Sequence, residues 1–168
     1  MSTSKSHHAA QRGITMVETL VALVVLSIGM LGIAALYVET MRANRTAMIR
    51  GHAVNLVQDM ADRIRANARA QLAYDIGQYG GNPATHNCVA GAACTDLELA
   101  EDDLAWWKQS AQTILPGSVV NTQFVPGAAV TLPDRFVISI AWTEPGSDPN
   151  NPDNYSYQTN LELLPVAP

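Results

Sequence analysis

A single carboxylate stands at the start of the most apolar stretch in the chain. Glu18 follows Ile14 by about one helical turn and precedes twenty residues without a charge, Thr19 to Val38. An ionised carboxylate inside a bilayer costs on the order of 2.5–3.5 kcal/mol, so it calls for a positively charged partner. If the chain were cut after Gly13, the new amine of Ile14 would lie one turn from Glu18. Glu18 therefore either pairs with an amine or marks the membrane interface.

The charge-free stretch is long enough to cross a membrane. At about 1.5 Å per helical residue, it covers the roughly 30 Å of a bilayer core. The residues before it, 1–13, carry Lys5 and Arg12 and no acid. A secretory signal has its cleavage site after the apolar region, whereas Gly13 lies before it. The sequence therefore predicts a transmembrane segment over residues 14–38 that stays in the mature protein.

This N-terminal pattern resembles the class III signal of type IV prepilins. It consists of a short polar leader ending in Gly13, then Ile14, Glu18 and an uninterrupted apolar stretch. The resemblance implies that a prepilin peptidase removes residues 1–13 as the leader and methylates the amine of Ile14. It also implies that Glu18 pairs with the N-terminal amine of a neighbouring subunit, where two charges that are costly alone stabilise each other.

Later segments extend the resemblance to minor pilins of the PilV type. They are the runs LVVLSIGMLGIAAL, QDMADRIRANARA, LAWWKQSAQTILPG and VISIAWTE. The resemblance implies the type IV pilin fold, an α+β fold in which a long N-terminal helix carries a C-terminal antiparallel sheet and one extra short helix. It also implies a low-abundance subunit that enters the filament or primes its assembly, and so supports adhesion and twitching motility.

The partners implied by this resemblance are prepilin peptidase, other minor and major pilins, and inner-membrane lipid before assembly. No cofactor and no enzymatic activity are expected, because the chain lacks G-x-S-x-G, H-E-x-x-H and phosphate-binding glycine patterns. Two alternatives remain open. A pseudopilin of a type II secretion system shares the leader and the long helix. A membrane-tethered periplasmic enzyme or binding domain shares the anchor.

The segment directly after the apolar stretch is basic, whereas the rest of the chain is acidic. Residues 39–70 carry six arginines against three acids, whereas residues 71–168 carry two basic residues against eleven acids. Nucleic-acid-binding domains need a basic surface, so no nucleic-acid partner is expected. The arginines soon after the apolar stretch would by themselves favour a cytoplasmic head. The leader and the cysteines favour the opposite orientation, with the head in the periplasm and later in an extracellular pilus.

Helical periodicity continues beyond the apolar stretch. No proline occurs before Pro83, and apolar residues recur at spacings of three and four. We therefore expect one helix over residues 14–70, followed by a periplasmic head over residues 71–168. The apolar face of the helix beyond the membrane is predicted to comprise Met41, Met48, Ile49, Ala53, Leu56, Val57, Met60 and Ile64.

The two cysteines, Cys88 and Cys94, lie in the segment HNCVAGAAC of a predicted loop over residues 74–95. With His86 they offer three candidate metal ligands, fewer than the four of a structural zinc site. An exported head favours a disulfide instead, because oxidising compartments allow disulfides to persist. We therefore predict a Cys88–Cys94 disulfide and no metal. Closing so small a loop contributes roughly 2 kcal/mol by chain entropy.

A second helix is predicted over residues 96–115. Thr95 and Glu98 match a capping box at its start, and Pro116-Gly117 ends it. Its acids near the N-terminus are stabilised by the helix dipole. The predicted apolar stripe comprises Leu97, Ala100, Leu104, Trp107, Ala111, Ile114 and Leu115.

Two adjacent pairs on this helix raise separate questions. Asp102 and Asp103 could suggest the paired carboxylates of an acid–base catalyst, but adjacent residues of a helix point to different faces. We therefore expect a solvated acidic face. Trp106 and Trp107 cannot share a face either, so Trp107 is expected in the core and Trp106 at a partly exposed position.

The remaining sequence alternates as β-strands do. RFVISIAW and YSYQTNLEL alternate strictly, and weaker strands are predicted over residues 119–124 and 129–132. The polar run EPGSDPNNPDN between the two strong strands is predicted to be a long hairpin loop. A calcium site at Asp148, Asn150 and Asp153 is the alternative for this run. The apolar face of the sheet is expected to pack on the distal half of the long helix.

Overall fold

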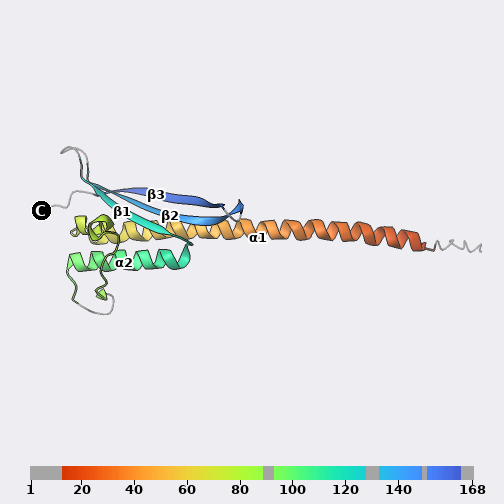
Figure 1. Ribbon diagram of the computed structural model, residues 1–168, viewed down its shortest axis with the longest axis horizontal. Helices are drawn as coiled ribbons and strands as arrows, with labels where there is room; N and C mark the ends of the chain where they lie inside the picture. Colours follow the sequence, from red (N-terminus) through yellow and green to blue (C-terminus); the bar gives the residue numbers. More distant parts are fainter. Residues whose placement is uncertain (1–12, 89–92, 128–132, 149–150, 164–168) are drawn as a thin grey trace, which may run out of the picture. The chain divides into compact units, whose positions relative to one another are not determined.

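The computed structural model describes residues 13–88, 93–127, 133–148 and 151–163 of the chain. These residues form two α-helices, α1 (Met16–Ala66) and α2 (Asp96–Ile114), and two 3-10 helices, η1 (Gln71–Tyr74) and η2 (Ile76–Tyr79). Three strands, β1 (Val119–Val125), β2 (Arg135–Asp148) and β3 (Asn151–Glu162), make one antiparallel sheet in the order β1-β2-β3 (Figure 1). The element content is that of the predicted α+β class.

The chain divides into two compact units, Met1–Asn44 and Arg45–Pro168. In the N-terminal unit the described residues belong to α1 and the short segment before it, and all their side chains are exposed. The C-terminal unit contains the rest of α1, the remaining helices and the sheet.

The core of the C-terminal unit lies between α1, α2 and the sheet. α1 contributes Val57 and Met60, both fully buried, and α2 contributes Trp107, also fully buried. The predicted inner face of β2 is confirmed by the burial of Phe136, Ile138, Ile140 and Trp142. Figure 1 shows the sheet and α2 beside the C-terminal part of α1. The distal half of the long helix therefore covers the sheet, as predicted.

The predicted apolar faces extend further than the core does. Met41 and Met48 are 59% and 65% exposed, so the fully buried face of α1 begins only at Ala53. In α2, Leu97 and Ile114 are 59% and 42% exposed. Helical periodicity identifies a face but not its ends, because the ends depend on how far the packing partner reaches.

The turn after α1 begins earlier than predicted, since the helix ends at Ala66 rather than near residue 70. Asn67 there donates its side-chain amide to the carbonyl of Asp96 at 2.8 Å and to Tyr74 Oη at 3.3 Å. Gln71 adopts a left-handed backbone, with φ of 27°, as the chain enters η1. Contacts distant in sequence thus replace the last helical turn.

The start of α2 is as predicted. Thr95 Oγ1 accepts the Glu98 N–H at 3.3 Å, and Glu98 Oε2 accepts the Thr95 N–H at 2.8 Å, which completes the capping box. After the helix, Gly117 has φ of 60° and leaves no room for a side chain. A Cβ there would lie 2.9 Å from Thr143 Oγ1 on β2.

The long hairpin differs from its prediction. The polar run expected to be a loop is mostly strand, because β2 continues to Asp148 and β3 begins at Asn151, with an irregular register between Glu144 and Asp148. Backbone N–H and C=O groups pair whatever side chains they carry, so side-chain polarity did not end these strands. The weak strand predicted over residues 129–132, and Asn150 of the calcium alternative, lie outside the described residues.

Candidate functional site

The residues predicted for processing and assembly lie at the N-terminal end of α1. Gly13 and Ile14 precede the helix in irregular backbone, and Ile14 is 75% exposed. Thr15 caps the helix, because its Oγ1 accepts the Glu18 N–H at 3.3 Å. Glu18 is exposed in the first turn, where the helix dipole stabilises an acid. The peptide bond between Gly13 and Ile14 is therefore accessible, as a protease substrate requires.

The N-terminal unit presents an apolar surface. An 18-residue window of α1 has a mean hydropathy of 2.5, and none of it is buried. By length and composition, α1 can therefore cross a membrane. Within residues 14–38, the hydroxyl of Thr19 donates to the Met16 carbonyl at 2.8 Å and that of Ser27 to the Leu23 carbonyl at 2.7 Å. Neither hydroxyl needs water, which suits a helix in lipid.

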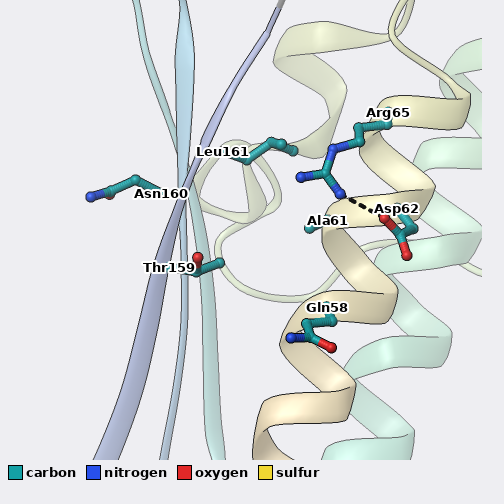
Figure 2. A pocket seen from close by; sticks show the side chains of 7 residues that line it. All are labelled: Gln58, Ala61, Asp62, Arg65, Thr159, Asn160 and Leu161. Carbon is teal, nitrogen blue, oxygen red and sulfur yellow. Dashed lines mark hydrogen bonds and ion pairs between the residues drawn. The ribbon is translucent and has the colours of Figure 1, made fainter.

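A small polar pocket lies between α1 and β3 in the C-terminal unit (Figure 2), with a volume of about 260 Å³. Its lining residues are Gln58, Ala61, Asp62, Arg65, Thr159, Asn160 and Leu161. Arg65 Nη1 and Asp62 Oδ1 form an ion pair at 2.6 Å, and both side chains are more than half exposed. No histidine or cysteine is among these lining residues, so the pocket offers hydrogen bonding rather than nucleophilic or metal chemistry.

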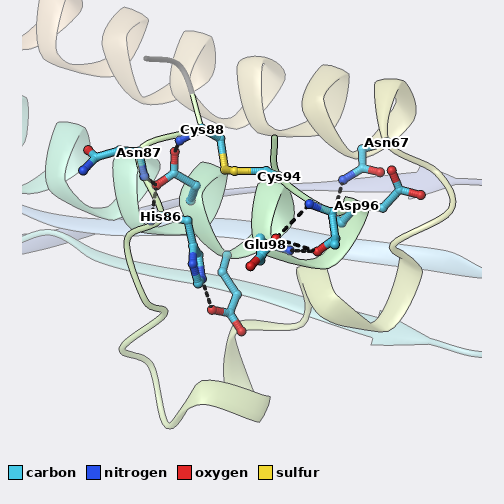
Figure 3. Close-up of a disulfide and its surroundings, with 10 residues drawn as sticks. Asn67, His86, Asn87, Cys88, Cys94, Asp96 and Glu98 are labelled. Carbon is cyan, nitrogen blue, oxygen red and sulfur yellow. Dashed lines mark hydrogen bonds and ion pairs between the residues drawn. A yellow bond between two sulfur atoms is a disulfide. The ribbon is translucent and has the colours of Figure 1, made fainter. Parts of the chain in front are cut away.

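Asp102 binds the backbone of residues 86–88, which lie next to the disulfide in Figure 3. Its carboxylate accepts the N–H groups of His86 at 2.8 Å, Asn87 at 3.1 Å and Cys88 at 3.1 Å. Cys88 and Cys94 form the predicted disulfide, with their Cα atoms 5.7 Å apart. Burial opposes ionisation of Asp102, but the three N–H bonds outweigh it and lower its pKa below the usual value. Asp102 thus holds residues 86–88 in the conformation that places Cys88 beside Cys94.

His86 and Glu101 form a second link between this loop and α2. His86 Nε2 lies 2.7 Å from Glu101 Oε2. This hydrogen bond raises the pKa of His86 above its usual value. The metal alternative for the HNCVAGAAC segment needs free thiolates and a free imidazole. In the structure the disulfide uses both sulfur atoms, and Glu101 is the partner of the imidazole.

Asp103 belongs to a different network, which joins α1, η1 and α2. It accepts hydrogen bonds from Arg63 Nη1 at 2.6 Å and from Tyr74 Oη at 2.7 Å. Arg63 also pairs with Asp59 at 2.9 Å and lies over the ring of Trp106, 4.4 Å from its centroid. Burial and the bond to Asp103 raise the pKa of Tyr74 well above its usual value. These contacts fix the position of α2 on the C-terminal part of α1.

A third network ties β2 to α1. Glu144 is 5% exposed and accepts hydrogen bonds from Arg50 Nε at 3.3 Å and Trp142 Nε1 at 2.9 Å. Arg50 also lies 4.4 Å from the ring centroid of Tyr155 on β3. The buried carboxylate is therefore both paired and hydrogen-bonded, which a buried charge requires.

The expectation of a solvated acidic face on α2 is wrong. Asp102 and Asp103 are each 8% exposed. They point to different faces, as predicted, but each face has its own polar partners. These partners come from residues 14 to 40 positions away in sequence. Both carboxylates are already hydrogen-bonded within the protein, so neither is free to act in acid–base catalysis. The helical pattern of α2 gave no indication of these two networks.

Replacing Asp102 by asparagine is expected to lower the free energy of unfolding by about 1–3 kcal/mol at neutral pH, because the amide presents a donor to a backbone N–H. The folded pKa of Asp102 lies below its unfolded value of about 3.9, so its contribution is complete above that pH and is lost as pH falls through the folded pKa. Urea unfolding of the full chain in detergent, followed by tryptophan fluorescence, measures this. Asp62→Asn is the control, since Asp62 is 74% exposed; equal losses in both variants would contradict the assigned role.

Comparison with known protein families assigns the chain to a family. Residues 8–34 match the family model of the prokaryotic N-terminal methylation motif, and residues 35–105 match that of type IV pilin Tt1218. The matches adjoin one another and contain the processing segment, α1 and the disulfide loop. The chain is a type IV pilin with a class III prepilin N-terminus. Comparisons with curated proteins and with solved structures found no match.

The family matches indicate how this pilin is processed and assembled. The methylation motif implies processing by prepilin peptidase and incorporation among pilins, and the apolar helix fits a membrane-anchored protein that is later assembled into a filament. The pilin family indicates a structural role rather than catalysis. Among the described residues, no group of three metal-binding side chains is close enough to hold an ion.

The predicted site residues of the pilin fall into two separate groups. Gly13, Ile14 and Glu18 lie together in the N-terminal unit, whereas Cys88 and Cys94 lie in the C-terminal unit. Sequence reasoning did not identify the buried acids Asp102, Asp103 and Glu144. An acid within an apolar or amphipathic run was the available signal for burial. That signal does not identify the residue that pairs with the acid.

Proposed function

We propose that this pilin is a minor subunit of a type IV pilus, of the PilV type. It is anchored in the inner membrane by residues 14–38, with residues 71–168 in the periplasm. Prepilin peptidase cuts after Gly13 and methylates the amine of Ile14. The mature subunit then enters the filament or primes its assembly, and Glu18 pairs with the N-terminal amine of a neighbouring subunit. In this role it supports adhesion and twitching motility.

The observation that carries the proposal is the arrangement at the start of α1. Glu18 is the sole charged residue between Ile14 and Val38, and it follows an accessible Gly13–Ile14 bond. The surrounding side chains are apolar and exposed, so they need a membrane or other helices around them. In that environment an unpaired carboxylate is unfavourable, and an amine on a neighbouring subunit would neutralise it.

Two further observations support the finer parts of the proposal. The Cys88–Cys94 disulfide favours an oxidising compartment and hence a periplasmic head. The PilV resemblance rests on segments that become α1, α2 and β2, including the Trp107 position at the centre of the core.

The decisive experiment compares the membrane-extracted protein from cells with and without prepilin peptidase. Intact mass and N-terminal fragment spectra should show a chain starting at methylated Ile14 in the presence of the peptidase, and a Met1 start in its absence. Quantification of sheared pili should find the protein at a small fraction of the major pilin. A Met1 start in both samples would overturn the processing scheme. Correct processing without any protein in pili would favour the secretion pseudopilin.

A further inference from the structure

The two edges of the sheet differ in how their backbone groups are covered. Along β1, the η1–η2 segment lies against the outer edge. Asp75 Oδ2 accepts the Phe124 N–H at 3.1 Å, and Thr122 Oγ1 bonds to the Tyr74 carbonyl at 2.6 Å and the Ile76 N–H at 3.2 Å. The η1–η2 segment of the same chain therefore lies beside this edge and takes up the Phe124 N–H, which hinders further strand pairing there.

The opposite edge, along β3, is open in the described part of the chain. β3 pairs with β2 on one side from Asp153 to Glu162, and no described strand pairs with its other side. An edge strand of this length presents a row of unpaired N–H and C=O groups. Residues 153–162 contain neither lysine nor proline, the residues that usually protect such an edge.

The polar pocket of Figure 2 adjoins this open edge. Figure 2 shows Leu161 and Thr159 on the side of β3 towards α1, whereas Asn160 points away from the helix. The other wall is α1, with Gln58 and the Asp62–Arg65 ion pair. A strand added beside β3 would cover the pocket, and its inward side chains would meet an amide, a hydroxyl and a balanced ion pair.

We propose that the open edge of β3 and this pocket accept an extended polypeptide segment from a neighbouring pilin subunit. An extended backbone is the ligand that matches alternating donors and acceptors along a strand. The pocket carries no net charge, so uncharged polar side chains suit its inward positions. The methylation motif implies incorporation among pilins, so a neighbouring pilin is the polypeptide expected beside this edge. This inference rests on the proposed incorporation of the protein into pili.

Site-specific photocrosslinking in piliated cells tests the proposal. A photoreactive phenylalanine analogue at Asn160 points away from the core, within reach of a strand paired with β3. The same analogue at Gln123, an exposed residue of the covered β1 edge, is the matched control. We expect Asn160 to crosslink to a peptide of another pilin in sheared pili, with little or no product from Gln123. Crosslinks confined to the same chain, or equal products at both positions, would overturn the proposal.

A charged substitution separates edge pairing from mere proximity. Thr159→Lys places a charge on the inward side of the edge, which discourages strand pairing. The intersubunit crosslink from Asn160 should fall about tenfold, which corresponds to about 1.4 kcal/mol of binding free energy. Gln123→Lys, on the covered edge, should leave it unchanged. Melting temperatures of both variants in detergent identify any folding defect.

The amount of protein in sheared pili distinguishes a failure of the β3 inference from a failure of the proposed function. Normal incorporation without an intersubunit crosslink at Asn160 would overturn the β3 inference and leave the proposed function standing. Absence of the correctly processed protein from pili would overturn both.

Discussion

Replacing Glu18 by alanine is expected to reduce incorporation into the filament at least about a hundredfold. In the proposed assembly, the carboxylate pairs with the amine of Ile14 of a neighbouring subunit in a dry environment. Removing one member of a buried ion pair costs about 3–5 kcal/mol, because the other charge is left without a partner. Insertion into the membrane should not suffer, since an intramembrane charge is itself unfavourable there.

The measurement is the ratio of this pilin to the major pilin in sheared pili, together with the mass of the membrane-bound pool. The mass shows whether the variant is still cut after Gly13, so that a processing defect is not mistaken for an assembly defect. Glu39→Ala is the matched control, because Glu39 is also an exposed acid of α1, paired with Arg42 at 3.9 Å. If a correctly processed Glu18→Ala variant were incorporated at the wild-type level, this result would contradict the ion-pair proposal. Glu18 would then remain an interface marker favoured by the helix dipole.

Replacing Trp107 by alanine is expected to lower the free energy of unfolding by about 3–5 kcal/mol, because it leaves a large cavity in the core. The Trp107 side chain is fully buried, and its indole N–H donates to the Leu56 carbonyl on α1 at 2.8 Å. Its neighbour Trp106 is 47% exposed, and the Arg63 guanidinium lies over its ring. Trp106→Ala should therefore cost less than about 1 kcal/mol.

Urea unfolding of the full chain in detergent, followed by circular dichroism, compares these adjacent tryptophans. Trp107→Phe keeps most of the volume but loses the hydrogen bond, so an intermediate loss of stability is expected. Similar losses from Trp106→Ala and Trp107→Ala would contradict the assignment of one tryptophan to the core and the other to the surface.

The local elements of this protein could be predicted from sequence because each depends on neighbouring residues. The long helix follows from its periodicity and the absence of proline, and the start of α2 follows from the Thr95–Glu98 capping box. The inner face of β2 follows from strict alternation. The methylation-motif match covers residues 8–34, which lie consecutively in the chain.

The boundaries of those elements were less predictable because they depend on distant partners. α1 ends at Ala66, where Asn67 bonds to Tyr74 and Asp96 instead of continuing the helix. The hairpin strands extend through polar residues because backbone pairing with the opposite strand, rather than side-chain apolarity, defines them.

Sequence alone therefore determined the prepilin signature, the apolar helix, the disulfide pair and the α+β class. Tertiary structure alone decided which acids are buried. Asp102 and Asp103 are adjacent and chemically identical, yet one binds the disulfide loop and the other binds Arg63 and Tyr74. It also decided that one sheet edge is covered and the other is open. The physical reason is that burial of a charge or a strand edge depends on partners brought close by folding, which local patterns do not encode.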